Sequence, residues 1–527
     1  MAVFPARSNV SRAPIMRRAA RAAGALTLAV VGLAGCIGQD PSPKAASAPA
    51  TAPPGVTDPA KAPRYATFYD QKVTWKACLG VDGVQCADMI VPLDWNDPAG
   101  STIKIALTRG LSEGKKIASL VFNPGGPGVG ARDFVKQYRE QIGASLADSF
   151  DFVGMDPRGT GASDPIECLT NAEKDRFLPQ DTTPDATTSV ADVVASAKEL
   201  GAYCEKRNPT TLAHVDTLSA AKDMDVLRAV LGEQVLTYWG ASYGTYLGAW
   251  YAQTFPWRVG RFVLDGAVDP SLTLAQYTEG QVEGFDLALR SYLGYCLSQN
   301  GCPLRGTLDE ALGEMVSLVD GADITPLRSA GGRELTQSLM VTGIVQGLYS
   351  EGLWPSLTAA LSQAERGDGA GLMALADEYL ERSKDGTYST VVDANAAIYC
   401  LDHPETRTLA QISTDAKALA AKYPPLGNET AWSGINCLEW PVKAVLHPQK
   451  LAADGAAPIL VVGTVGDPAT PYRWARSLAS QLSSGVLLTY DGEGHTAFRR
   501  GNSCIDGVVD AYLIYGTVPK PGKHCPA

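Results

Sequence analysis

The sequence predicts an α/β fold interrupted by a mainly helical insertion. Short apolar and β-branched runs that end in glycine or aspartate are typical of buried parallel strands. Such runs occupy residues 119–122, 150–155, 235–239, 261–264, 458–463 and 485–490. Apolar residues recur every three or four positions, as in amphipathic helices, over residues 190–206, 217–231 and 243–254. Strand and helix therefore alternate, which indicates a mostly parallel sheet.

The alternation stops after about residue 270 and resumes near residue 458. The stretch between is rich in Leu, Ala and Glu and has helical periodicity, broken by glycines and prolines. Because it separates strands whose ends carry candidate catalytic groups, we expect it to cover the carboxyl edge of the sheet as a cap. The predicted organisation of the folded part is a first core segment at 67–270, a cap at 271–455 and a second core segment at 456–527.

Composition limits the classes of function. The chain has 527 residues, of which 45% are apolar and 19% charged, enough for a large core. Its 56 acidic and 45 basic residues give a net charge of -11. Such a balance disfavours nucleic acid or an anionic membrane surface as the main partner.

The N-terminus predicts export. A cluster of arginines precedes an Ala-rich apolar run that is too short to remain as a membrane-spanning helix, so residues 1–35 are interpreted as a secretory signal peptide. The run ends in Leu33-Ala34-Gly35 before Cys36, which resembles the lipobox of bacterial lipoproteins, in which the cysteine sulfur is lipidated. An ordinary signal peptide with a chance cysteine is the alternative. Residues 36–66, rich in Pro and Ala, would tether the protein to the extracellular side of the membrane.

The cysteines indicate an oxidising compartment. There are eleven, and none forms the C-x-x-C pairs of zinc or thioredoxin-like sites. Without Cys36 an even number remains, and sequence alone leaves the pairing open. Loop closure favours near neighbours, which predicts the pairs Cys78 with Cys86, Cys168 with Cys204, Cys296 with Cys302, Cys400 with Cys437, and Cys504 with Cys525.

The strongest local motif is Gly240-Ala241-Ser242-Tyr243-Gly244, between a predicted strand and a predicted helix. This is the context that the G-x-S-x-G nucleophile elbow requires. A serine hydroxyl needs a base and an orienting acid to become a nucleophile. We therefore predict that Ser242 is a nucleophile whose partners lie further along the chain.

His495 is the best placed of the five histidines, because it follows the predicted strand at 485–490. His214 precedes the elbow, His403 and His447 fall in the insertion, and His524 adjoins a cysteine. The predicted acid is Asp467, which follows the preceding strand and completes the order Ser, Asp, His of α/β-hydrolases. Asp467 as a helix cap, and Asp491 or Glu493 as the orienting acid, are the alternatives.

A tetrahedral intermediate needs two N–H donors for its oxyanion. One is predicted from Tyr243 and the other from Gly126, in the glycine-rich loop 123–128. That loop lacks the Lys-Ser or Lys-Thr of a phosphate-binding loop. Residues 156–161, Asp-Pro-Arg-Gly-Thr-Gly, are interpreted as a turn braced by an Asp–Arg pair, without a catalytic role.

These motifs together resemble the secreted tripeptidyl aminopeptidases and related actinobacterial serine hydrolases, distant relatives of prolyl iminopeptidases. The resemblance includes Leu-Asp-Gly at 264–266, Gly-Asp-Pro-Ala-Thr-Pro at 466–471 and Gly-His at 494–495. It implies an α/β-hydrolase fold and an exopeptidase that takes a free peptide N-terminus and releases a short peptide, without a metal or organic cofactor.

An acidic group must hold the substrate ammonium, and Glu439 and Asp402, each beside a predicted disulfide, are the candidates. The alternative is that both are ordinary surface acids. An esterase with the same catalytic groups and a non-catalytic binding lipoprotein are the competing functions.

Overall fold

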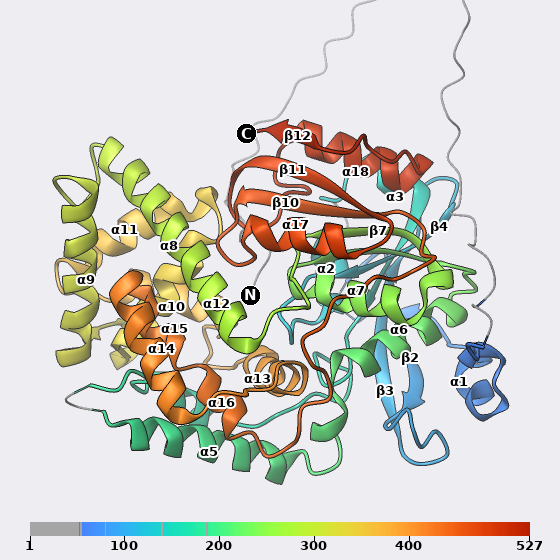
Figure 1. The fold of residues 1–527 in the computed structure, drawn as a ribbon, viewed down its shortest axis with the longest axis horizontal. Coiled ribbons are helices and arrows are strands. Elements are labelled where there is room, and N and C mark those ends of the chain that lie inside the picture. Colours follow the sequence, from blue (N-terminus) through green and yellow to red (C-terminus); the bar gives the residue numbers. More distant parts are fainter. Residues whose placement is uncertain (1–51, 53–54, 80, 139–140, 186–187) are drawn as a thin grey trace, which may run out of the picture.

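A ten-stranded sheet forms the centre of the computed structural model, which describes residues 52, 55–79, 81–138, 141–185 and 188–527 (Figure 1). Its strand order is β1-β2-β3-β5-β4-β6-β7-β10-β11-β12. Neighbouring strands are parallel from β5 to β12, and β1, β2 and β3 form an antiparallel edge. The predicted signal peptide and Cys36 lie outside the described residues.

The strands of this sheet are β1 (Lys76–Ala77), β2 (Val84–Pro92), β3 (Thr102–Gly110), β4 (Ala118–Asn123), β5 (Phe150–Met155), β6 (Leu236–Ala241), β7 (Val259–Asp265), β10 (Ile459–Gly466), β11 (Gly485–Glu493) and β12 (Lys523–Pro526). All six strands predicted from apolar runs are present, which confirms the α/β class. The antiparallel pair β2 and β3 and the edge strand β12 were not predicted, because none of them is a continuous buried run and β12 is mostly exposed.

Helices cover both faces of the sheet. One face packs against α2 (Ala131–Tyr138), α3 (Ala144–Ser149) and α18 (Ser503–Tyr515). The other packs against α1 (Ala66–Tyr69), α6 (Thr217–Val230), α7 (Tyr243–Thr254) and α17 (Tyr472–Gln481). The apolar periodicity at 217–231 and 243–254 thus forms the contact surfaces of α6 and α7, as amphipathic helices require.

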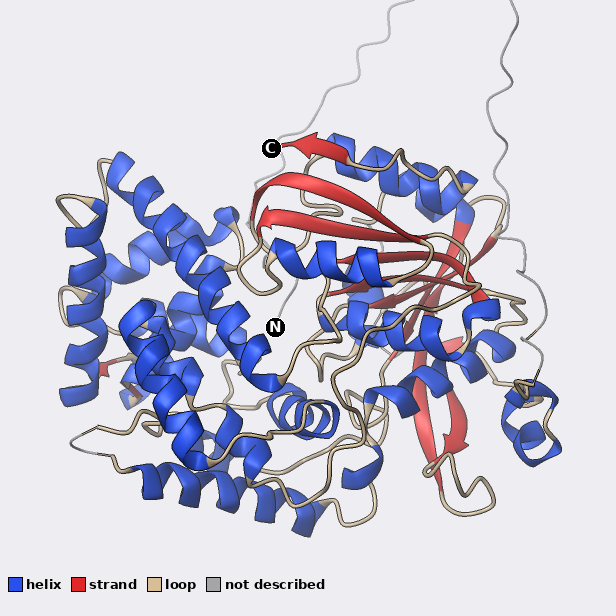
Figure 2. Cartoon of the chain, in the orientation of Figure 1, coloured by secondary structure: helices blue, strands red, loops and turns tan. Residues whose placement is uncertain are grey.

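The insertion forms a helical cap beside the sheet, as Figure 2 shows by its concentration of helices on one side. It contains α8 (Leu274–Ser298), α9 (Leu308–Ile324), α10 (Gln337–Leu348), α11 (Trp354–Ala364), α12 (Ala370–Tyr379), α13 (Val391–Asp402), α14 (Leu409–Lys422), α15 (Leu426–Ala431) and α16 (Gly434–Leu438), with a small hairpin of β8 (Leu327–Arg328) and β9 (Glu334–Leu335). Helices α8 to α12 bury a hydrophobic cluster of their own, so the cap has an independent core.

Two helices from the first core segment also pack against the cap. They are α4 (Asn171–Phe177) and α5 (Val190–Arg207). The apolar face of α5 joins a cluster with α8 and α14. The buried ammonium of Lys174 on α4 lies 2.7 Å from the carboxylate of Asp393 on α13. The cap is therefore assembled from two separate stretches of the chain.

All five predicted disulfides form, and each joins two cysteines that follow one another among the cysteines of the chain. Cys168–Cys204 anchors α5, and Cys400–Cys437 links α13 to α16. No helix in the described part of the chain combines the length and the apolar character needed to cross a bilayer.

The turn after β5 differs from the prediction. Arg158 does not pair with Asp156: it donates two hydrogen bonds of 2.7 Å to Asp223 on α6, and both side chains are fully buried. Asp156 instead accepts the backbone N–H groups of Arg132 and Ala162. The predicted Asp–Arg brace is wrong because Arg158 reaches across to another helix, a contact that leaves no local pattern.

Candidate active site

Ser242 lies at the sharp turn between β6 and α7. Its φ of 55° and ψ of -124° are unusual for a residue with a side chain and cost about 1–3 kcal/mol. A Cβ on Gly240 would lie 2.4 Å from the carbonyl oxygen of Gly244. The chain therefore crosses itself too closely for a side chain there, which explains the glycine that precedes Ser242 in the motif.

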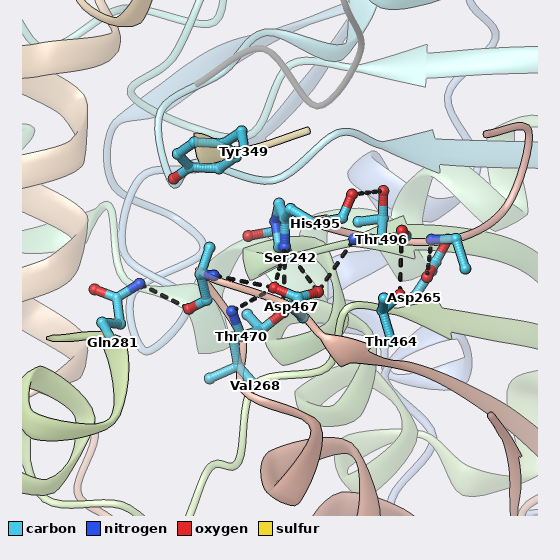
Figure 3. A network of polar contacts seen from close by, with 12 residues as sticks. Ser242, Asp265, Val268, Gln281, Tyr349, Thr464, Asp467, Thr470, His495 and Thr496 are labelled. Carbon is cyan, nitrogen blue, oxygen red and sulfur yellow. Dashed lines mark hydrogen bonds and ion pairs between the residues drawn. The ribbon is translucent and has the colours of Figure 1, made fainter. Parts of the chain in front are cut away.

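His495 and Asp467 are joined at the ends of β11 and β10. The imidazole Nδ1 lies 2.9 Å from Oδ1 and 3.1 Å from Oδ2 of Asp467. Because the carboxylate accepts from Nδ1, that nitrogen carries the proton and Nε2 is left as the base. Ser242, which follows β6, is drawn with these two residues in Figure 3. The structure thus joins His495 to Asp467 and places Ser242 after β6, at the same carboxyl edge of the sheet.

Asp467 also stabilises the backbone around it. Its carboxylate accepts the N–H groups of Ala469 at 3.0 Å, Thr470 at 2.8 Å and Thr496 at 3.1 Å. The helix-cap alternative is wrong, because α17 begins at Tyr472 after Pro471 and Asp467 binds amides of the loop before that helix. Of the alternative acids, Asp491 pairs with His524 at 2.9 Å and Glu493 accepts from Ser291.

A buried carboxylate that sequence reasoning missed lies next to these groups. Asp265 is fully buried at the end of β7. Burial raises the pKa of its carboxyl to about 6, although the N–H groups of Phe498 and Ala497 and the nearby His495 lower it. The Leu-Asp-Gly motif at 264–266 was the only trace of this residue in the sequence.

The glycine-rich loop after β4 lies against the elbow. The N–H of Gly125 donates to Asn123 Oδ1 at 2.9 Å and is therefore already used. The next amide along the loop is that of Gly126. The amide of Tyr243 is the first of α7, where no helical carbonyl precedes it to act as acceptor. The two amides predicted to bind an oxyanion therefore belong to segments that meet at Ser242.

Replacing Gly125 with alanine should lower kcat about 100-fold, because a misplacement of about 1 Å has that effect on a reaction. Gly125 has a φ of +103°, and a Cβ there would lie 2.6 Å from the carbonyl oxygen of Ala241 and 2.9 Å from Ser242 Cβ. The loop would have to move away from the elbow. The measurement is kcat for a peptide or ester substrate.

Gly455→Ala is the matched control for Gly125→Ala. Gly455 has a φ of +86°, but no atom lies within 4 Å of the position that a Cβ would take there, so the substitution adds backbone strain without a clash. It should lower stability and leave kcat unchanged. A Gly125→Ala enzyme with wild-type kcat would contradict the assignment of the loop.

The cap contacts His495 directly. The ring of Tyr349, which follows α10, lies edge-on to the imidazole of His495 with 5.4 Å between ring centres. Its carbonyl oxygen accepts the N–H of His495 at 2.9 Å, and Figure 3 shows the Tyr349 side chain above the site. Arg500 donates to the His495 carbonyl at 2.9 Å.

The two candidate ammonium ligands occupy different environments. Asp402 is buried, and its two oxygens accept from the N–H and the hydroxyl of Thr217. Burial raises the pKa of Asp402 well above its ordinary value. The Thr217 hydroxyl also lies 2.6 Å from the Tyr243 hydroxyl. Glu439 has a side chain that is 25% exposed, 3.6 Å from the ammonium of Lys198, and is the more accessible of the two.

Two of the remaining histidines have other partners. His403 packs its ring against Tyr399, with 4.7 Å between ring centres, and burial lowers its pKa to about 4. His524 pairs with Asp491 in an exposed position. His495 is therefore the histidine that the structure joins to a carboxylate at the elbow.

An α/β sheet with a strained serine, a histidine and an aspartate at its carboxyl edge defines a serine hydrolase of the α/β-hydrolase fold. Residues 422–525 match the family described as TAP-like protein. Serine protease Hip1 of Mycobacterium tuberculosis is 37% identical over 475 residues, which cover 86% of this chain and 91% of Hip1. The chain belongs to this family of TAP-like serine hydrolases.

Two further relatives show the range of activities named in the family. Carboxylesterase B of Mycobacterium tuberculosis is 34% identical over 448 residues, covering 84% of this chain and 86% of the relative. Tripeptidyl aminopeptidase of Streptomyces lividans is 28% identical over 467 residues, covering 86% of each chain. The family resemblance drawn from the motifs is confirmed.

Proposed function

We propose that the protein is a secreted, membrane-tethered serine exopeptidase that releases short peptides, of three residues, from free N-termini. In this proposal Ser242 is the nucleophile, His495 the general base and Asp467 the orienting acid. The observation that carries it is the pair of contacts from His495 Nδ1 to Asp467, which leaves the other ring nitrogen as the base in this proposal.

The proposed reaction has two stages. Ser242 Oγ attacks the scissile carbonyl while His495 Nε2 takes its proton, and the amides of Gly126 and Tyr243 bind the oxyanion. His495 then protonates the amine, which departs, and the acyl group remains bound to Ser242 as an acyl-enzyme. Water, deprotonated by the same nitrogen, attacks the ester, and the released acid is the short peptide.

The choice of peptide substrates rests on the relatives named as a serine protease and a tripeptidyl aminopeptidase. A library of peptides with free and acetylated N-termini tests the exopeptidase claim. We expect cleavage three residues from free N-termini and little cleavage of acetylated peptides. Equal cleavage of both sets would refute exopeptidase action.

We further propose that Glu439 holds the substrate ammonium and that Asp402 supports the Tyr243 side chain through Thr217. Glu439→Gln should raise KM for peptides with free N-termini about 10-fold or more, since a charge-assisted hydrogen bond is worth about 1.5–3 kcal/mol. Michaelis–Menten measurements with paired free and acetylated peptides check this, because acetylated peptides should show no change.

Glu283→Gln is the control for Glu439→Gln. Glu283 is another cap carboxylate paired with a cation, at 2.7 Å from Arg473, with a side chain 35% exposed. It should leave KM unchanged for both peptide forms. Equal effects of the two substitutions would assign Glu439 to the surface rather than to substrate binding.

An esterase is the second candidate, favoured by the relative named carboxylesterase B. Parallel assays with tripeptidyl and short-acyl chromogenic substrates separate the two functions. Rapid ester turnover without peptide cleavage would favour the esterase. Attachment of the chain to the membrane through a lipid on Cys36 belongs to the same proposal and concerns residues outside those described.

A further inference from the structure

Asp265 occupies the junction between the strands that carry the candidate catalytic groups. It is the last residue of β7, which pairs with β6 on one side and with β10 on the other. Ser242 follows β6 and Asp467 follows β10. The Asp265 side chain has no exposed surface, so its contacts are all with the protein.

The backbone of Asp265 holds the nucleophile. Its carbonyl oxygen accepts the N–H of Ser242 at 2.9 Å, and the next amide, of Gly266, donates to the Val462 carbonyl at 3.1 Å. Ser242 is therefore fixed to β7 at the point where the strained turn begins.

The side chain of Asp265 holds the histidine segment. Its Oδ1 accepts the N–H of Ala497 at 3.0 Å and its Oδ2 accepts the N–H of Phe498 at 2.9 Å. Figure 3 shows Asp265 beside this segment. These amides lie two and three residues after His495. One residue thus contacts both the nucleophile and the segment that carries the base.

Two carboxylates divide the histidine segment between them. Asp467 accepts hydrogen bonds from the imidazole Nδ1 and from the N–H of Thr496. Asp265 accepts the next two N–H groups, those of Ala497 and Phe498. Thr496 has a φ of 65°, a conformation that persists only where the surroundings impose it. Loss of either carboxylate would allow the segment to relax.

We propose that Asp265 is a positioning residue that fixes the imidazole of His495 relative to Ser242 by accepting the amides of Ala497 and Phe498. The proposal rests on the proposed roles of Ser242 and His495. Both carboxylate oxygens accept: Oδ1 and Oδ2 share the N–H of Ala497 at 3.0 and 3.2 Å, and Oδ2 also accepts the N–H of Phe498. An asparagine has one acceptor oxygen and would turn its NH₂ group toward one of the donors.

The test is Asp265→Asn, measured as kcat and KM per active site after titration with a fluorophosphonate. We expect kcat to fall about 10- to 100-fold, the range expected of a misplacement of up to about 1 Å, with KM within twofold of wild type. The titration removes unfolded enzyme from the comparison, so a purely structural role would leave kcat per site unchanged.

Asp225→Asn is the matched control. Asp225 is also fully buried, and its carboxylate accepts from the Tyr69 hydroxyl at 3.0 Å and from Arg228 at 2.7 Å. It lies on α6, and its substitution should reduce thermal stability while kcat per titrated site stays at the wild-type value. If Asp265→Asn behaves in the same way, the positioning role is wrong.

Two further outcomes keep the proposals distinct. If Asp265→Asn does not fold, the smaller Asp265→Ser, which retains one acceptor, is measured by the same method, and a wild-type kcat per site overturns the proposal. If Ser242→Ala retains turnover, the proposed function fails, whatever the result at Asp265.

Discussion

Replacing Ser242 with alanine is expected to lower kcat on the order of 10⁶-fold, as loss of the nucleophile does in serine hydrolases. The substitution removes the attacking oxygen and keeps the strained turn, whose φ of 55° a methyl side chain tolerates as well as a hydroxymethyl one. The acyl-enzyme can no longer form, so labelling by a fluorophosphonate should disappear together with turnover of peptide substrates.

The control for Ser242→Ala is Ser480→Ala. Ser480 is exposed on α17 and donates to the Ser477 carbonyl, so its loss should leave turnover and labelling unchanged. A Ser242→Ala protein that still reacts with the fluorophosphonate would move the nucleophile elsewhere. Absence of labelling in the wild-type protein under all conditions would instead favour a non-catalytic binding function.

Replacing Asp467 with asparagine should lower kcat about 10⁴-fold with little change in KM, because the amide favours the wrong imidazole tautomer. In the wild type both carboxylate oxygens lie within 3.1 Å of His495 Nδ1. An NH₂ group facing that nitrogen would leave the proton on Nε2, where it blocks general-base catalysis. Steady-state kinetics on active-site-titrated enzyme measure the loss.

The exposed pair of Asp491 and His524 provides the control for this substitution. Its two side chains are 42% and 54% exposed and lie 2.9 Å apart, so it reproduces the Asp–His contact away from Ser242. Asp491→Asn should leave kcat unchanged. If it lowered kcat as far as Asp467→Asn did, the assignment of the orienting acid would be wrong.

Local patterns account for the parts of the fold and site that could be predicted from sequence. The buried strands are continuous apolar runs, and the helices that cover them are amphipathic, so both leave a periodic trace. The elbow is visible because Gly240 must lack a side chain where the chain crosses itself. His495 and Asp467 follow from strand order, since parallel strands end at one edge of the sheet.

Contacts between distant segments account for what could not be predicted. Arg158 pairs with Asp223 across 65 positions of sequence, and Asp265 reaches amides more than 230 positions away. Neither partner is marked by spacing or composition. The packing of α5 against the cap was missed for the same reason, because its apolar face fits a helix neighbour and a sheet neighbour equally well.

The contacts of Tyr349 with His495 make the cap part of the reaction centre. The backbone N–H of His495 donates to the carbonyl oxygen of Tyr349 in the cap, and the Tyr349 ring lies against the imidazole. A movement that lifted this part of the cap to admit a peptide would also break the backbone hydrogen bond from His495 to Tyr349. Substrate entry would favour moving the Tyr349 segment away, whereas an active base requires that segment to stay against His495. An enzyme of this design therefore favours approach routes that leave Tyr349 in place.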